Sequence, residues 1–159
     1  LIDDEETTRT LTDRLARHGA ELLRETIPLW LDKKIDPQSQ DRDQASYTEL
    51  VNKADGLIDW SHSAFAISRE VRAFDPWPSS FTYWEGKRLK ISKGLPIEGK
   101  SDIEVGTIIT GNAVGDIGVV TGDGILLIDE LQIEGKGTIS VNQFLNGYPR
   151  FLGARLTQA

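Results

Sequence analysis

The hydrophobic pattern of the first 34 residues is helical. Apolar positions recur at helical spacing in two stretches, first at Leu11 and Leu15 and then at Leu23, Ile27, Trp30 and Leu31. Thr7 or Thr8 is a suitable N-cap, and Gly19 is a typical helix end. Pro28 is expected to kink or restart the second stretch. We predict two amphipathic helices. Because they cannot bury both apolar faces against each other alone, we expect the chain to be part of a longer protein.

Residues 35–60 lack such periodicity. They include Pro37 and a polar run over residues 38–44. A polar, aperiodic segment with a proline is typical of a linker or surface connection. We therefore predict a linker over residues 35–60.

Beyond residue 60 the pattern changes from helix to strand. One more helix is expected over residues 61–74, capped by Ser61, with a shared apolar face of Ala64, Ile67, Val71 and Phe74. Alternating apolar positions then predict strands over residues 81–84, 87–91, 106–110, 117–121 and 125–133, before a short helix over 140–145 and an extended end over 151–156. The predicted fold is mainly β with flanking helices: a small open β-barrel over residues 61–159, preceded by the helical segment and the linker.

Composition narrows the chemistry. The 159 residues contain no cysteine, which excludes disulfides, thiolate zinc sites and cysteine nucleophiles. No apolar run approaches the roughly 20 residues that span a bilayer, and the start is acidic rather than that of a secretory signal. We expect a cytoplasmic protein with no membrane partner. His18 and His62 lie in no metal-binding or catalytic motif, so we predict no metal site and no catalytic residue.

Charge is unevenly distributed within the net −7. Residues 1–60 hold 8 Lys/Arg and 14 Asp/Glu, whereas residues 61–159 hold 10 and 11. A cationic group of Lys87, Arg88, Lys90 and Lys93 lies in the second part, near the aromatic residues Phe81, Tyr83 and Trp84. Arg88 and Lys90 share one face of a strand, and a basic, aromatic surface suits a phosphate backbone. The alternative is a solvated barrel edge, on which lysines prevent pairing with another chain.

Three other features have a structural and a functional interpretation. The run Gly122-Asp123-Gly124 is followed by a strand rather than a helix, which favours a hairpin turn over a phosphate loop. The acidic residues 3–6 favour a solvated helix N-terminus over a metal or partner site. Trp60 and Trp77 could line a ligand pocket, but we favour packing anchors, because Pro76 and Pro78 fix the backbone around Trp77 in a rigid corner.

The ordered runs of this chain resemble the carboxy-terminal half of the methionyl-tRNA formyltransferases. The runs are Ile58-Asp59-Trp60-Ser61, Arg72-Ala73-Phe74-Asp75-Pro76-Trp77-Pro78 with Phe81-Thr82, Leu89-Lys90-Ile91, Gly106-Thr107-Ile108, Thr121-Gly122-Asp123-Gly124, Leu131-Gln132 with Gly135-Lys136, and Phe144-Leu145 with Gly147. Upstream, Glu6-Thr7, Pro37, Gln40-Asp41 and Ala45 with Tyr47 resemble the end of the catalytic domain and its linker. The resemblance covers nearly the whole chain.

The resemblance implies transfer of a formyl group from 10-formyltetrahydrofolate to methionyl initiator tRNA. It also implies that residues 1–34 end the catalytic domain and that residues 61–159 form an OB-like domain that helps to hold the tRNA. The catalytic Asn, His and Asp and the Ser-Leu-Leu-Pro loop of the family do not occur here. We therefore expect a monomeric fragment that binds tRNA, holds no cofactor and catalyses no formyl transfer, with a missing N-terminal catalytic domain as its partner.

On this resemblance we place tRNA binding at Lys53, Lys87, Arg88, Lys90 and Lys93, with Lys136, Arg150 and Arg155 as weaker candidates. The near-neutral charge of residues 61–159 departs from the basic domain expected of the family, and it either weakens such a role or confines it to one face. Two alternatives remain open. One is the corresponding part of a formyltransferase or formyl-folate hydrolase that acts on a small molecule, and the other is a stand-alone nucleic-acid-binding or protein-binding module.

Overall fold

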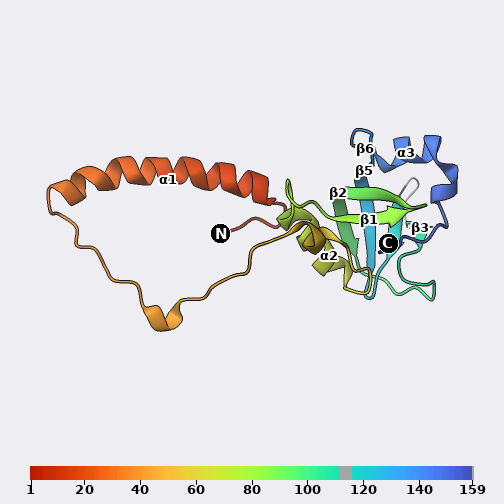
Figure 1. Cartoon of the computed structure of the whole chain (residues 1–159), viewed down its shortest axis with the longest axis horizontal. Coiled ribbons are helices and arrows are strands. Elements are labelled where there is room, and N and C mark those ends of the chain that lie inside the picture. Colours follow the sequence, from red (N-terminus) through yellow and green to blue (C-terminus); the bar gives the residue numbers. More distant parts are fainter. Residues whose placement is uncertain (112–115, 159) are drawn as a thin grey trace. The chain divides into compact units, whose positions relative to one another are not determined.

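The computed structural model describes residues 1–111 and 116–158. The chain divides into two compact units, Leu1–Val51 and Asn52–Ala159, which are described separately (Figure 1).

The first unit is dominated by one helix, α1 (Thr8–Leu31), followed by the short 3-10 helix η1 (Arg42–Gln44). Thr7 caps α1 in a reciprocal capping box with Thr10. The expectation of two helices is wrong, because α1 continues through both Gly19 and Pro28. A glycine inside a helix costs only about 1 kcal/mol relative to alanine. Pro28 lies in the last turn, where few helical residues follow it.

The apolar face of α1 is uncovered in this structure. None of its residues is buried, and Leu15, Leu22, Leu23, Ile27, Leu29, Trp30 and Leu31 are all exposed. Among the residues described, no helix is long and apolar enough to cross a membrane.

The second unit is built on a curled antiparallel sheet of six strands. Its order is β1-β2-β5-β4-β3, with β6 paired to β5 (Figure 1). The strands are β1 (Phe81–Trp84), β2 (Lys87–Ile97), β3 (Ile108–Thr110), β4 (Ile117–Val120), β5 (Ile125–Ile133) and β6 (Ile139–Ser140). The predicted strands are all present, and β2 extends six residues beyond its predicted end at Ile91. This is the expected mainly β, partly closed barrel.

The C-terminal segment joins the two edges of the sheet. Thr157 exchanges two backbone hydrogen bonds of 3.0 Å with Tyr83 of β1. Leu156 donates to the Gly106 carbonyl, and Ile108 of β3 donates to the Ala154 carbonyl, each at 2.9 Å. The predicted extended end therefore completes the barrel wall, because it satisfies backbone groups that an open sheet edge would leave unpaired.

Helices close the core of this unit. The α2 helix (Ala64–Ala73) packs on β2 and β5, and buries Ala64, Ile67 and Val71. Its N-cap is Ser63 rather than the predicted Ser61, because the Ser63 hydroxyl accepts the Ala66 N–H. At the other end, α3 (Val141–Gly147), η3 (Pro149–Phe151) and the residue between them contribute Phe144, Phe151 and Tyr148. These rings meet one another and Trp84 of β1 in edge-on or stacked pairs.

The second unit begins before the end of the predicted linker. Residues 53–56 form the 3-10 helix η2 (Lys53–Gly56), and Ile58 and Trp60 are buried in the core. Trp60 donates its indole N–H to the Thr82 hydroxyl at 3.2 Å, and Thr82 donates to the Thr157 carbonyl at 2.8 Å. Residues 52–60 are thus part of this unit's packing.

Candidate nucleic-acid interface

The β1–β2 hairpin sorts its side chains onto two faces. A tight turn at Glu85 and Gly86, both with positive φ, pairs Tyr83 with Arg88 and Phe81 with Lys90. Directly paired residues of an antiparallel ladder lie on the same face. Since Leu89 and Ile91 are buried in the core, Arg88 and Lys90 lie on the opposite face of the hairpin, with Tyr83 and with Phe81, which is itself only 7% exposed.

Arg88 is held against an aromatic ring. Its guanidinium carbon lies 3.9 Å from the centroid of Phe81, and Tyr83 meets Phe81 edge-on at 5.9 Å. A planar guanidinium on an aromatic face gains cation–π attraction and loses little freedom on binding an anion. The Nε atom of Arg88 is buried and has no hydrogen-bond partner among the residues described. The side chain is therefore positioned but not neutralised.

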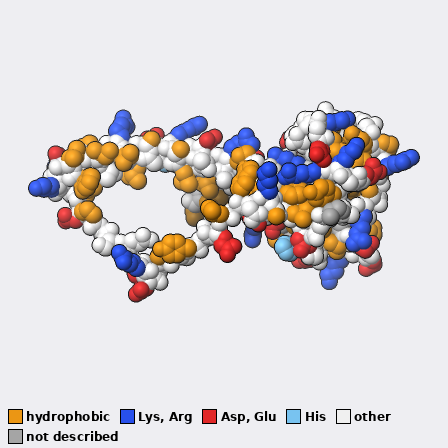
Figure 2. Space-filling view, viewed as in Figure 1, with side chains coloured by type: hydrophobic (Ala, Val, Ile, Leu, Met, Phe, Trp, Pro, Cys, Tyr) orange, Lys and Arg blue, Asp and Glu red, His pale blue; other side chains and the backbone are white. Residues whose placement is uncertain are grey.

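Lys87 and Lys90 extend this positive surface. Within the described part of the chain, no carboxylate oxygen lies within 4.0 Å of the charged nitrogens of Lys87, Arg88 or Lys90. On the face seen in Figure 2, Lys and Arg side chains gather beside an apolar patch near β1 and β2. These three cations are available to phosphate oxygens.

Lys93 differs from the other predicted cations. A bulge at this point of β2 shifts the register, so that Lys93 opposes Glu130 and is exposed rather than directed into the core. Its ammonium nitrogen lies 3.2 Å from a carboxylate oxygen of Asp129. The charge of Lys93 is therefore partly offset by that carboxylate, unlike the charges of Arg88 and Lys90.

The remaining predicted cations have different surroundings. Lys53 is exposed on η2, whose last residue, Gly56, lies against the backbone of Ser79 next to β1. Lys136 lies 5.3 Å from the Tyr148 ring, and Arg155 is paired with Glu104 at 2.6 Å. Lys136 lies in the turn after β5, where the Glu134 N–H donates to the Arg88 carbonyl at 2.9 Å, so Lys53 and Lys136 both come from segments beside the β1–β2 hairpin.

Two of the tryptophans lie where the sequence did not place them. Trp84, expected on the basic surface, is 4% exposed and belongs to the aromatic core, because alternation along β1 puts it on the side of Thr82. Trp77, expected as a packing anchor, is 53% exposed. In the corner around it, Pro78 is buried and Pro76 is exposed, and both proline peptide bonds are cis.

Trp77 borders a hollow beside the basic residues. Its volume is about 370 Å³, and it is lined by Pro76, Trp77, Pro78, Ser79, Arg88, Lys90, Gln132 and Glu134. The corner and the outer face of the hairpin therefore meet at one place. This juxtaposition of an exposed ring with two cations was not evident from the sequence, in which these residues lie on separate runs.

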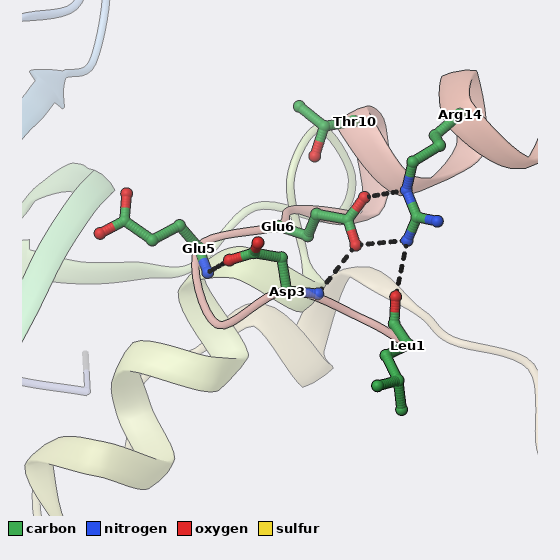
Figure 3. A pocket seen from close by; sticks show the side chains of 6 residues that line it. All are labelled: Leu1, Asp3, Glu5, Glu6, Thr10 and Arg14. Carbon is green, nitrogen blue, oxygen red and sulfur yellow. Dashed lines mark hydrogen bonds and ion pairs between the residues drawn. The ribbon is translucent and has the colours of Figure 1, made fainter.

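The acidic N-terminal residues form an internal ion pair. Figure 3 shows the Glu6 carboxylate facing the Arg14 guanidinium, with contacts of 2.6 and 2.7 Å, and the Asp3 N–H donates to the same carboxylate at 3.0 Å. The hydrogen bond from Arg14, with that from Asp3, lowers the pKa of Glu6 to about 2. No group of three or more metal-ligating side chains occurs in residues 1–111 and 116–158.

The histidines and the glycine-rich run are explained by local structure. His18 lies 3.7 Å from Glu21, and His62 lies 3.4 Å from Glu70, all near the surface. The Gly122 N–H donates to the carbonyls of Trp60 and His62, at 2.9 and 3.0 Å. The run at residues 122–124 is the predicted turn between β4 and β5, not a phosphate loop.

Known proteins resemble this chain in both sequence and fold. Residues 50–149 match the family described as formyl transferase, C-terminal domain. A methionyl-tRNA formyltransferase of Coxiella burnetii (strain RSA 331 / Henzerling II) is 37% identical over 148 residues, which are 93% of this chain and 47% of that relative. The enzyme of the same name from Geotalea daltonii is 39% identical over 155 residues, 98% and 49% of the two chains. The chain spans about half the length of the curated relatives it matches.

Solved structures add a likeness of fold. A variant of HypX from Aquifex aeolicus matches with a TM-score of 0.67 over 95% of this chain and 28% of that chain, at 14% identity. HypX in complex with tetrahydrofolic acid matches with a TM-score of 0.60 over 83% and 23% of the two chains, at 16% identity.

Proposed function

The chain belongs to the formyl transferase C-terminal domain family, and from that membership we propose that it is the C-terminal half of a methionyl-tRNA formyltransferase. The parent enzyme would transfer a formyl group from 10-formyltetrahydrofolate to the amino group of methionyl initiator tRNA, in the cytoplasm and as a monomer. The observation that carries this proposal is the 36–39% identity, over nearly the whole chain, to relatives that bear this name. Their name favours the tRNA enzyme over the small-molecule alternatives.

This half would bind tRNA rather than catalyse. Arg88 and Lys90 supply two charges on one rigid face, and Lys87 and Lys53 would extend it along the backbone of the RNA. Phosphate contacts position a nucleic acid without identifying its bases. Recognition of the initiator tRNA therefore falls to other parts of the parent enzyme.

Folate chemistry is assigned to the other half of the parent. The Ser-Leu-Leu-Pro loop and the Asn, His and Asp of the family do not occur in this sequence. The hollows beside Trp60 and Trp77 are open to solvent rather than enclosed. We therefore assign the binding of the formyl donor to the half of the parent that carries those residues.

The first unit offers a surface for that other half. The α1 helix presents an apolar face, including Leu23, Ile27 and Trp30, that nothing in its own unit covers. A surface helix normally buries such a face against a core. We assign this face to the catalytic half, of which α1 would be the last helix.

Binding to methionyl initiator tRNA, measured by filter retention at several salt concentrations, tests the tRNA-binding role. For wild type, log affinity should fall linearly with log salt concentration, with a slope of about −0.9 for each neutralised phosphate of a duplex. Arg88→Gln with Lys90→Gln should make that slope shallower by about 2, one for each lost contact. An elongator tRNA should lose affinity equally, because the contacts carry no sequence information.

A matched control keeps the change in net charge the same. Lys100 lies beyond the far end of β2, which is seven residues and roughly 23 Å along the strand from Lys90, so Lys100→Gln should leave the slope nearly unchanged whereas Lys90→Gln should not. Equal slopes for these two single variants would reject the hairpin face as the binding surface. Absence of any binding in low salt would reject the tRNA-binding role itself.

A further inference from the structure

Trp77 is a large aromatic ring that the fold holds in place without burying. It lies between Pro76 and Pro78, and the loop is fastened behind it by two hydrogen bonds of Ser79. The Ser79 N–H donates to the Phe74 carbonyl at 2.9 Å, and its hydroxyl donates to the Pro76 carbonyl at 2.8 Å. With 53% of its surface exposed, Trp77 contributes less to packing than its size allows. Binding of phosphate groups does not require an exposed aromatic ring, so the position of Trp77 needs another explanation.

The ring shares its hollow with charge and hydrogen-bonding groups. Arg88 and Lys90 line it together with Gln132 and Glu134, in a volume of about 370 Å³. This size falls in the range of small-molecule pockets, roughly 300–1,000 Å³. The buried Nε of Arg88 has no partner among the described residues, while its guanidinium is fixed over Phe81.

We propose that this hollow binds one unpaired nucleotide of an RNA, with its base stacked on Trp77 and its phosphate at Arg88 and Lys90. The inference rests on the proposed function and makes it more specific. A paired base has both faces covered by its neighbours in the stack, so an exposed ring can reach only a base at a loop, bulge or end. Stacking on an aromatic ring tolerates any base. The Glu134 carboxylate is an acceptor for a base amino group and repels a second phosphate.

The chemistry of an aromatic ring joined to an anion also describes a folate, so the experiment includes both ligands. Two labelled RNA hairpins of equal nucleotide number, each closed by a non-nucleotide linker so that no loop base is unpaired, are compared by fluorescence anisotropy in low salt. In one, four nucleotides at the 3′ end are unpaired, and in the other, the same number extend the stem by two base pairs. Equal phosphate count leaves the unpaired bases as the difference.

We expect wild type to bind the hairpin with unpaired nucleotides about tenfold more tightly. Trp77→Leu should abolish this preference and bind both hairpins like the fully paired one, whereas Trp77→Phe should keep most of it. Arg88→Gln should weaken binding to both. Melting temperatures of the two Trp77 variants establish that each is folded, and Trp77→Phe retains a ring should the leucine variant unfold.

The outcomes separate this inference from the proposed function. Equal, salt-dependent binding of both hairpins by wild type would overturn the inference and leave the tRNA-binding role intact. No binding of either hairpin would overturn both. Retention of the preference in Trp77→Leu, or displacement of the RNA by tetrahydrofolate at concentrations that leave the paired hairpin bound, would assign the hollow to another ligand or role.

Discussion

Replacing Trp60 and Trp77 in turn tests how much each tryptophan contributes to the stability of the barrel. Trp60 is 4% exposed and donates to Thr82, which in turn donates to the Thr157 carbonyl of the segment that closes the sheet. Truncating a buried tryptophan to alanine costs about 3–5 kcal/mol, because the cavity adds to the lost transfer energy. Trp60→Ala should therefore lower the stability of the second unit by about 4 kcal/mol.

Trp77 gives the contrasting value. Since about half of its surface is already in solvent and water fills the space that it leaves, the transfer term is halved and the cavity term vanishes. We expect Trp77→Ala to cost about 1–2 kcal/mol. Trp60→Phe, which keeps a ring but loses the hydrogen bond to Thr82, should cost about 1 kcal/mol beyond its smaller volume.

Scanning calorimetry measures the difference, because it does not depend on tryptophan fluorescence. For a unit of this size, 1 kcal/mol shifts the melting temperature by roughly 4–8 °C. Trp60→Ala should therefore melt at least about 8 °C below Trp77→Ala. Equal losses in the two alanine variants would refute the assignment of Trp77 to the surface and Trp60 to the core.

Three further predictions address other parts of the molecule. In an NMR titration, the Glu6 carboxyl should have a midpoint near pH 2, and Arg14→Gln should return that midpoint toward the usual 4.5. The stabilisation by the ion pair is complete above about pH 5 and is lost as the pH falls through 2. An unchanged midpoint in Arg14→Gln would contradict the pairing. Gly122→Ala should destabilise the second unit by about 2–3 kcal/mol in a urea titration, because the new Cβ would lie 1.8 Å from the Ser61 carbonyl oxygen; Gly137→Ala, where a Cβ meets nothing within 4 Å, is the control and should change little. The purified chain should transfer no formyl group from 10-formyltetrahydrofolate to methionyl initiator tRNA, and turnover above background would refute its assignment as the non-catalytic half.

Local pattern predicted most of the strands but not how they are joined. The alternation in Phe81–Trp84 and Ile125–Ile133 depends on neighbouring residues, and both strands are present. Closure of the barrel depends on hydrogen bonds between residues about 75 apart, such as Thr157 and Tyr83, for which the sequence carries no local signal. Gly19 and Pro28 misled the helix prediction, because the propensity of one residue is outweighed by the rest of a 24-residue helix.

The candidate site, like the fold, could be predicted from the sequence only where it depends on local pattern. Alternation correctly placed Arg88 and Lys90 on one face, and the same rule, applied through the hairpin register, would have moved Trp84 to the core. The position of Lys93 depends on a bulge, and the exposure of Trp77 depends on how the corner packs, which composition does not reveal. The glycine-rich turn shows the same limit. A glycine is needed at position 122 because the backbone of Trp60 and Ser61 lies against it, and this contact is not visible in the pattern of the two strands that the turn joins.

The most direct test of the RNA-binding face is chemical-shift mapping of the isotopically labelled chain with methionyl initiator tRNA in low salt. The largest changes are expected at Arg88, Lys90 and the indole N–H of Trp77, while the indole signals of Trp60 and Trp84 stay in place. Changes concentrated on α3 or the β4–β5 turn, with the hairpin face unaffected, would contradict the assignment of RNA binding to this face.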